Sequence, residues 1–280
     1  MIRVGTCAWS DHTGFYPRGV PPAGRLAHYA RFFPLVEVDS SFYYPPSARN
    51  CALWAERTPP HFRFHVKAHR TMTWHDRQAI PDPAALRTAT RQFAEAVEPM
   101  RQAGKLVALH FQFPPWFQRG VEAWDYLANV REALPDHLLA IEFRHRSWLE
   151  DAERVAETLQ LLQRHGFVHT ICDEPQIGSG SVPAVVEATS ADLAIVRLHG
   201  RNAQTWYKST ATTGERFKYR YSEEELREWL EPARALGAKA TDVHVLMNNN
   251  HEDSAVRNAW EMASLLDLGY ANPWGGSLLV

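Results

Sequence analysis

Hydrophobic and polar residues alternate in six of eight short, strand-like segments of the chain. Residues two apart in a β-strand point to the same side, so Ile141 and Phe143 share one face while Glu142 and Arg144 share the other. This pattern predicts strands whose hydrophobic face packs on helices and whose other face becomes polar. The predicted strands are 2–7, 35–39, 62–68, 105–113, 138–143, 167–172, 193–198 and 242–247.

Segments with helical signals separate these strands. Ser222, with Glu225 three residues later, is a capping box, and Gly166 is placed to end a helix. The predicted helices are 25–33, 48–57, 83–103, 120–133, 151–164, 222–236 and 253–266. Eight strands in alternation with about seven helices predict a single (β/α)₈ TIM barrel over residues 1–280, with an insertion at 200–221 after strand seven.

The polar strand ends predict one site, because the carboxyl ends of parallel strands meet at one mouth of a barrel, where barrel enzymes place their active sites. We expect one cavity there to be lined by Glu37, Lys67, Gln112, Glu142, Arg144, Arg197, His199 and Asn248.

Among these residues, Glu142 is the candidate general acid or base and His199 the candidate assistant. Arg144, Arg197 and Lys67 are the candidate partners of an anion, since arginine suits bidentate contacts with phosphate or carboxylate. Two alternatives stay open: Glu142 and Arg144 as a structural ion pair, and His199 as a hydrogen-bonded core residue.

Further ligand-binding candidates lie beside these positions. Asp39, Asp173, Arg201 and Asn249 follow strand ends, although the asparagine run also suits a turn.

The insertion adds Trp206 and Tyr219. It interleaves aromatic residues with five basic ones, which are Arg201, Lys208, Arg216, Lys218 and Arg220. Such a segment suits a lid over an anionic, ring-bearing ligand or a grip on single-stranded nucleic acid; its aromatic residues, Tyr207 included, could equally pack on the barrel rim.

Composition narrows the function classes. A net charge of −2 gives no overall basic footprint for nucleic acid, and no apolar run approaches the roughly 20 residues of a membrane helix. Three cysteines without metal-type spacing, and an amino terminus that enters a strand directly, predict free thiols in the cytoplasm.

No motif in the sequence indicates a metal site, a cofactor site or a glycosidase active site. Glu37, Glu142, Asp173 and His199 have suitable ligand atoms, but no close-spaced metal motif or glycine-rich phosphate loop is present, so we expect neither a metal nor a cofactor. Gln112 occupies the end of strand four, where a common type of barrel glycosidase has a carboxylate, which disfavours that chemistry.

Eight segments carry a family resemblance that spans most of the chain. They are 37–43 (EVDSSFY), 64–67 (FHVK), 111–115 (FQFPP), 142–148 (EFRHRSW), 196–201 (VRLHGR), 219–222 (YRYS), 248–250 (NNN) and 255–259 (AxxNA). The chain resembles the YecE-like family, domain of unknown function 72. The resemblance implies a TIM barrel and no particular reaction. The family tends to read Thr-His after strand three, whereas Trp74 separates Thr73 from His75 here, so His75 is left out of the expected site.

These observations favour an enzyme that acts on a small phosphate- or carboxylate-bearing ligand at the barrel mouth. One alternative is a nucleic-acid-binding protein or a metal-dependent phosphodiesterase similar to barrel-type abasic-site endonucleases, which is disfavoured because the mouth is poor in histidine. A second alternative is a non-catalytic ligand-binding protein. The oligomeric state is not predicted.

Overall fold

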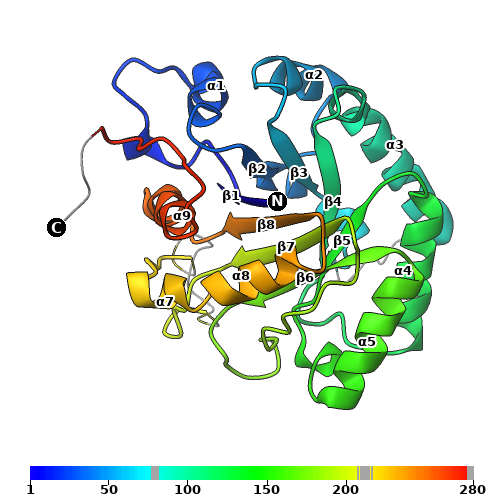
Figure 1. The fold of residues 1–280 in the computed structure, drawn as a ribbon. Helices are drawn as coiled ribbons and strands as arrows, with labels where there is room; N and C mark the ends of the chain where they lie inside the picture. Colours follow the sequence, from blue (N-terminus) through cyan, green and yellow to red (C-terminus); the bar gives the residue numbers. More distant parts are fainter. Residues whose placement is uncertain (77–81, 207, 209–214, 216, 276–280) are drawn as a thin grey trace.

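Eight parallel strands form a closed barrel in the computed structural model, which describes residues 1–76, 82–206, 208, 215 and 217–275 (Figure 1). The strands are β1 (Ile2–Thr6), β2 (Leu35–Val38), β3 (Arg63–Lys67), β4 (Leu106–Gln112), β5 (Leu139–Glu142), β6 (Phe167–Asp173), β7 (Leu193–Leu198) and β8 (Asp242–Met247). The order follows the chain, and β8 pairs with β1 to close the barrel. The predicted TIM barrel is therefore confirmed.

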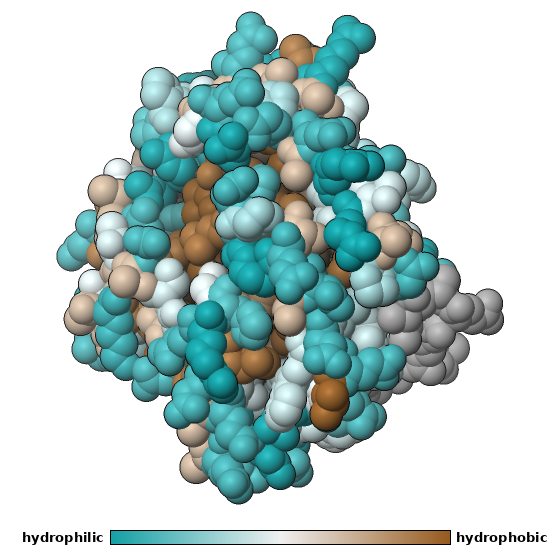
Figure 2. Space-filling view, turned by 90° about the vertical axis from the view of Figure 1, so that its right-hand side faces the viewer, coloured by the Kyte–Doolittle hydropathy of each residue, from teal (hydrophilic) through white to brown (hydrophobic). Residues whose placement is uncertain are grey.

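Helices surround the barrel and cover the outer faces of the strands (Figure 1). They are α1 (Arg25–Tyr29), α2 (Ala48–Glu56), α3 (Pro83–Gln102), α4 (Val121–Ala133), α5 (Ala152–Arg164), α7 (Glu223–Arg227), α8 (Leu230–Gly237) and α9 (Ser254–Leu265). Residues 174–192, all described, form no helix. Figure 2 shows the face over α3, α4 and α5 as mainly hydrophilic, with hydrophobic atoms visible chiefly in recesses. No described helix is long and apolar enough to cross a membrane.

The helix predicted at 222–236 is interrupted. The capping box of Ser222 and Glu225 forms as expected at the start of α7. The helix then breaks before α8, in which Pro232 is the third residue. Proline has no backbone N–H, and its ring clashes with the carbonyl four residues earlier, here that of Glu228, so an uninterrupted helix is disfavoured at this point.

The strand pattern separates an outer hydrophobic core from the barrel interior. Ile141 and Phe143 pack outward in the main core, while Ala140 joins a small apolar cluster that includes Ala108 and Ile195. Farther along the strands, toward their carboxyl ends, the interior positions become polar. The site therefore lies above a layer in which this apolar cluster is joined by a buried pair of histidines, His65 and His244, whose ring nitrogens lie 2.7 Å apart.

The contact between β1 and β2 is the weakest seam of the barrel ladder. Only Thr6 and Val36 pair directly, and the hydroxyl of Tyr29 accepts from the N–H of Thr6 at 3.0 Å and donates to the carbonyl of Leu35 at 2.9 Å. Gly5 allows the strands to approach, because a Cβ there would lie 2.1 Å from the Leu35 carbonyl oxygen.

We expect Gly5→Ala to lower the free energy of unfolding by about 1–3 kcal/mol or more, since the new methyl group must push β1 and β2 apart. Gly237→Ala, at the end of α8, is the matched control: its Cβ would meet only the Val243 side chain at 3.9 Å. Urea denaturation should show the control at least as stable as the parent. Equal stability of both variants would contradict the close approach.

Candidate functional site

A pocket of about 350 Å³ opens at the carboxyl-terminal mouth of the barrel. Its floor is polar and its walls are largely aromatic. The lining residues are Asp39, Phe42, Tyr43, Lys67, His75, Gln112, Phe113, Pro114, Pro115, Trp116, Arg144, Gly180, Trp206, Phe217 and Asn248. Six predicted ligand-binding residues are thus brought together, namely Asp39, Lys67, Gln112, Arg144, Trp206 and Asn248.

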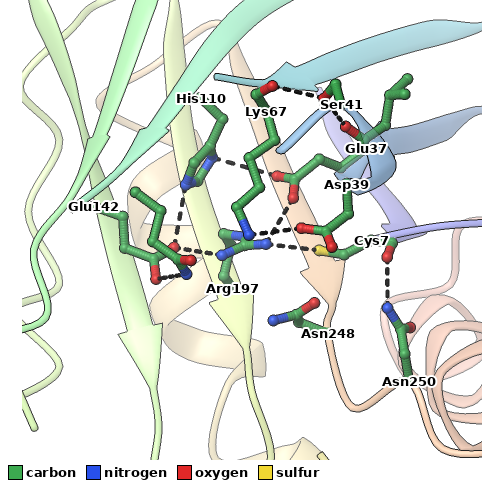
Figure 3. Close-up of polar contacts among 12 residues, drawn as sticks. Cys7, Glu37, Asp39, Ser41, Lys67, His110, Glu142, Arg197, Asn248 and Asn250 are labelled. Atoms are coloured by element: carbon green, nitrogen blue, oxygen red, sulfur yellow. Dashed lines mark hydrogen bonds and ion pairs between the residues drawn. The ribbon is translucent and has the colours of Figure 1, made fainter. Parts of the chain in front are cut away.

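Glu142 lies beneath this floor and is fully buried. Its Oε1 accepts a hydrogen bond from Gln112 Nε2 at 2.6 Å and one from Arg144 at 3.2 Å, and lies 3.1 Å from His199 Nε2. Its Oε2 accepts from Arg197 at 2.5 Å and contacts His110 Nε2 at 3.1 Å (Figure 3). The carboxylate therefore links the residues of the floor to the barrel interior.

Arg197 is the centre of this buried layer. Its guanidinium lies between two carboxylates and donates to Glu37 Oε1 at 2.6 Å and to Glu142 Oε2 at 2.5 Å (Figure 3). It also contacts Cys7 Sγ at 3.4 Å. Contrary to the expectation, neither Arg197 nor Glu37 lines the pocket, because both are fully buried and paired with each other.

His110, which the sequence analysis did not select, completes the layer. Its Nδ1 lies 3.3 Å from Glu37 Oε2 and its Nε2 lies 3.1 Å from Glu142 Oε2. The alternation in β4 places it on the interior face, two residues before Gln112. That parity was the available signal for this residue.

The electrostatics hold Glu142 as an anion and His199 as a neutral ring. Burial alone would raise the pKa of Glu142, but Arg197, His199 and His110 lower it well below the ordinary value. Burial lowers the pKa of His199 to about 3, against the opposing effect of Glu142. Its Nδ1 contacts Asn248 Nδ2 at 2.8 Å. Glu142 and His199 are fully buried beneath the pocket, and their catalytic roles remain predictions.

Arg144 connects the pocket with a second buried carboxyl, that of Glu174, which the sequence analysis missed. Arg144 NH2 lies 3.0 Å from Glu174 Oε2, and its guanidinium carbon lies 5.0 Å from the ring centroid of Trp206. Burial raises the pKa of Glu174 to about 7, with Arg144 opposing the shift. Continuing the interior parity of β6 past Cys172 would have selected Glu174.

Asp173, in contrast, lies on the outer side of β6. It accepts hydrogen bonds from Trp229 Nε1 at 2.6 Å and from Arg201 NH2 at 2.7 Å, and Arg201 also pairs with Glu228. From the sequence, both Asp173 and Arg201 are expected to contact the ligand. The structure places them outside the pocket lining because Asp173 is one residue out of the interior register.

Tyr219 and Asn249 also lie outside the pocket lining. The hydroxyl of Tyr219 donates to Glu225, and Asn249 donates to the carbonyl of Tyr219 at 3.0 Å and to Asn258 at 2.9 Å. These bonds attach the end of the insertion to α7 and α9. They give Tyr219 and Asn249 a structural role that does not require a ligand.

The rest of the insertion contributes Trp206 and Phe217 to the pocket wall. Arg220 pairs with Glu261. Tyr207 and Arg216, which were also expected to take part, lie outside the described residues.

His75, which the sequence analysis set aside, lines the pocket. Trp74 adopts φ 58°, a left-handed conformation that costs a non-glycine residue about 1–2 kcal/mol. The turn is fixed by a 2.6 Å hydrogen bond from Trp116 Nε1 to the Trp74 carbonyl. His75 then contacts Thr73 Oγ1 at 2.9 Å, and burial lowers its pKa to about 3. The extra residue in the motif is accommodated by this turn.

One group of described residues could offer ligands to a metal ion. It consists of Glu142, Cys172 and His199, whose potential ligand atoms all lie within 4.8 Å of one another. Two guanidiniums, those of Arg197 and Arg144, already bond to Glu142 and oppose a cation there. Burial also raises the pKa of the Cys172 thiol well above its ordinary value. We therefore assign no metal to these three residues.

Replacing Arg197 tests whether the buried layer supports the fold. Arg197→Met leaves Glu37 and Glu142 without their shared cation, and we expect it to lower the free energy of unfolding by about 3–5 kcal/mol. Arg227→Met, which breaks an exposed pair with Glu223, is the control and should change stability little. Similar denaturation midpoints for the two variants would contradict the structural role of the layer.

Comparisons with known proteins give this geometry a family. The family model described as "Protein of unknown function DUF72" matches residues 3–276. The UPF0759 protein YunF of Bacillus subtilis (strain 168) is 39% identical over 274 residues, which cover 97% of this chain and 96% of YunF. Among solved structures, a DUF72 family protein from Enterococcus faecalis V583 superposes with a TM-score of 0.87 at 31% identity, covering 99% of this chain and 100% of that one. Another, from Thermotoga maritima MSB8, gives 0.83 at 32% identity, with 95% and 99% covered. As the resemblance in the sequence predicted, the chain belongs to the DUF72 family.

Proposed function

We propose that the protein is an enzyme that acts on a small ring-bearing molecule with a phosphate or carboxylate group, bound in the pocket at the barrel mouth. The observation that carries the proposal is the position of Arg144, whose guanidinium lines a cavity with largely aromatic walls. Concave sites of a few hundred Å³ with apolar walls and a few placed polar groups are typical of small-molecule binding.

The charges around the pocket indicate how an anion would be accepted. Lys67 pairs with Asp39 at 2.7 Å, and Arg144 is shared between Glu142 and Glu174. Because both cations are already paired, an anion must compete with a carboxylate. Glu174 is the partner that can give way, because its raised pKa lets it become neutral near pH 7.

The residues beneath the floor have a supporting role in this proposal. Glu142 bonds to both Gln112 and Arg144, and His199 contacts both Glu142 and Asn248. We infer that Glu142 and His199 orient three floor residues toward the ligand. A direct proton transfer by Glu142, the role first expected from the sequence, would require Gln112 or Arg144 to move aside.

The alternatives receive less support from this geometry. A metal-dependent phosphodiesterase needs a cation next to its substrate, whereas the one metal-type group of the described residues is fully buried and already bonded to guanidiniums. A ligand-binding protein without turnover would use the same pocket. Incubation with a panel of phosphorylated and carboxylated metabolites, followed by product detection, separates it from an enzyme.

Sulfate binding tests the anion site without knowledge of the substrate. We expect Arg144→Met to weaken sulfate binding, measured by isothermal titration calorimetry, by at least about tenfold, because a charge-assisted hydrogen bond contributes roughly 1.5–3 kcal/mol. Arg201→Met is the matched control, since Arg201 also pairs with carboxylates near the mouth but does not line the pocket. Equal losses in both variants, or no sulfate binding by the parent, would count against the proposal.

The pH dependence of sulfate binding should follow Glu174. Sulfate does not titrate near neutrality, whereas ionised Glu174 holds Arg144 and repels the anion. Affinity should be constant below about pH 7 and fall above it by up to about tenfold per pH unit, as one proton is taken up with each anion. Glu174→Gln should bind sulfate with little pH dependence. A parent whose sulfate affinity does not change between pH 6 and 8.5 would refute the role of Glu174.

A further inference from the structure

The pocket contains an amine whose surroundings differ from those of the other described lysines. Lys105 is buried and donates to carbonyls at the end of α2, and Lys239 pairs with Glu187 on the surface. Lys67 alone among the described lysines lines the pocket. Its side chain is 9% exposed, and that of its partner Asp39 is 29% exposed, so the pair faces the cavity.

The single hydroxyl proton of Ser41 lies between two backbone carbonyls at the ends of the strands that carry this pair. The hydroxyl of Ser41 lies 2.6 Å from the carbonyl oxygen of Lys67 and 2.6 Å from that of Val38, and so bridges the ends of β3 and β2 (Figure 3). Asp39 and Lys67 follow and end these two strands. As a result, the Lys67 amine lies 2.7 Å from Asp39 Oδ1 and 4.7 Å from the ring centroid of Phe42.

We propose that Lys67 is a nucleophile that forms an imine with the carbonyl carbon of the ligand, so that the pocket takes an aldehyde or ketone that also carries an anionic group. The inference rests on the proposed function, because Arg144 would hold the anionic group while Lys67 reacts. Lysine amines of enzymes form such Schiff bases with carbonyl substrates.

The step balances without any further reactant. The lysine nitrogen forms a bond to the carbonyl carbon, and the bond between that carbon and its oxygen breaks. The ammonium loses two protons, both of which leave with the oxygen as water, and the iminium keeps the third proton and one positive charge. Asp39, at hydrogen-bond distance from the nitrogen, is placed to relay these protons.

The surroundings suit the iminium product as well as the starting ammonium. The charge of the nitrogen is +1 before and after the step, so the ion pair with Asp39 and the contact with the ring of Phe42 are retained. Burial alone would raise the pKa of Asp39, but Lys67 outweighs it and lowers the pKa, so the carboxylate stays ionised beside the iminium. His75 adds no opposing charge, since its pKa of about 3 keeps it neutral.

Borohydride trapping tests the proposal on the whole protein. The protein is incubated with pyruvate, which combines a ketone with a carboxylate, and is then treated with sodium borohydride, digested and mapped by mass spectrometry. Reduction makes an imine permanent, so we expect one reduced pyruvate on the peptide that contains Lys67. Its labelled fraction should exceed that of the Lys239 peptide by at least about tenfold, because the pocket would hold the ketone against the Lys67 amine, whereas Lys239 is paired with Glu187 on the surface.

Variants separate the reaction from the fold. Lys67→Arg keeps the charge and should abolish labelling at this site, and Asp39→Asn keeps the amine and should slow labelling. Lys239→Arg should change neither result, and melting temperatures identify any variant that does not fold. Propionaldehyde, which has no anionic group, should label Lys67 in preference to Lys239 by a smaller factor than pyruvate does.

The outcomes distinguish this inference from the proposed function. Labelling of Lys67 at the level of Lys239, with both pyruvate and propionaldehyde, overturns the imine; if sulfate still binds through Arg144, the proposed function stands alone. An equal preference for Lys67 over Lys239 with both reagents, together with no sulfate binding, would keep the reactive amine and remove the anion site. Labelling of Asp39→Asn at the parent rate would remove Asp39 from the step.

Discussion

The guanidinium of Arg197, shared between Glu37 and Glu142, is the interaction on which the rest of the site depends. Two carboxylates and one cation inside a barrel are costly to desolvate, and they are tolerated only because they are bonded to one another. The contacts of His110 with both carboxylates also help to compensate for their desolvation. The layer thus supports, from beneath, the polar residues that form the floor of the pocket.

This buried layer determines which charges remain for a ligand. Because Arg197 is occupied, the positive charge that faces the pocket comes from Lys67 and Arg144, each of which is paired with a carboxylate at the edge of the cavity. An arrangement of this kind favours a ligand that replaces a carboxylate over one that binds a free cationic patch.

The sequence was sufficient to predict the barrel. Hydrophobic segments predicted all eight strands, and period-two alternation in six of them predicted that Asp39, Lys67, Gln112 and Asn248 would lie together, as they do in the pocket lining, while their binding roles remain predictions. The burial of each side chain was harder to predict. Alternation along a strand indicates the direction in which a side chain points, but not whether another residue covers it.

Register at a strand end was the second limit. Asp173 and Glu174 are adjacent acids, and the one that faces the interior is decided by how far β6 extends. His75 needed a third kind of information, since the left-handed turn at Trp74 that brings it to the pocket depends on a hydrogen bond from Trp116, which is distant in sequence. Contacts between residues that are distant in sequence therefore decide features of the site that the local hydrophobic pattern does not predict.

A crystal structure of the protein grown from ammonium sulfate would locate both the anion and the buried layer in one experiment. We expect sulfate density in the pocket against Arg144, with Arg197 still bonded to both Glu37 and Glu142. Sulfate bound to Arg197, or an Arg144 that keeps both carboxylate partners while sulfate binds only elsewhere on the protein, would contradict this expectation.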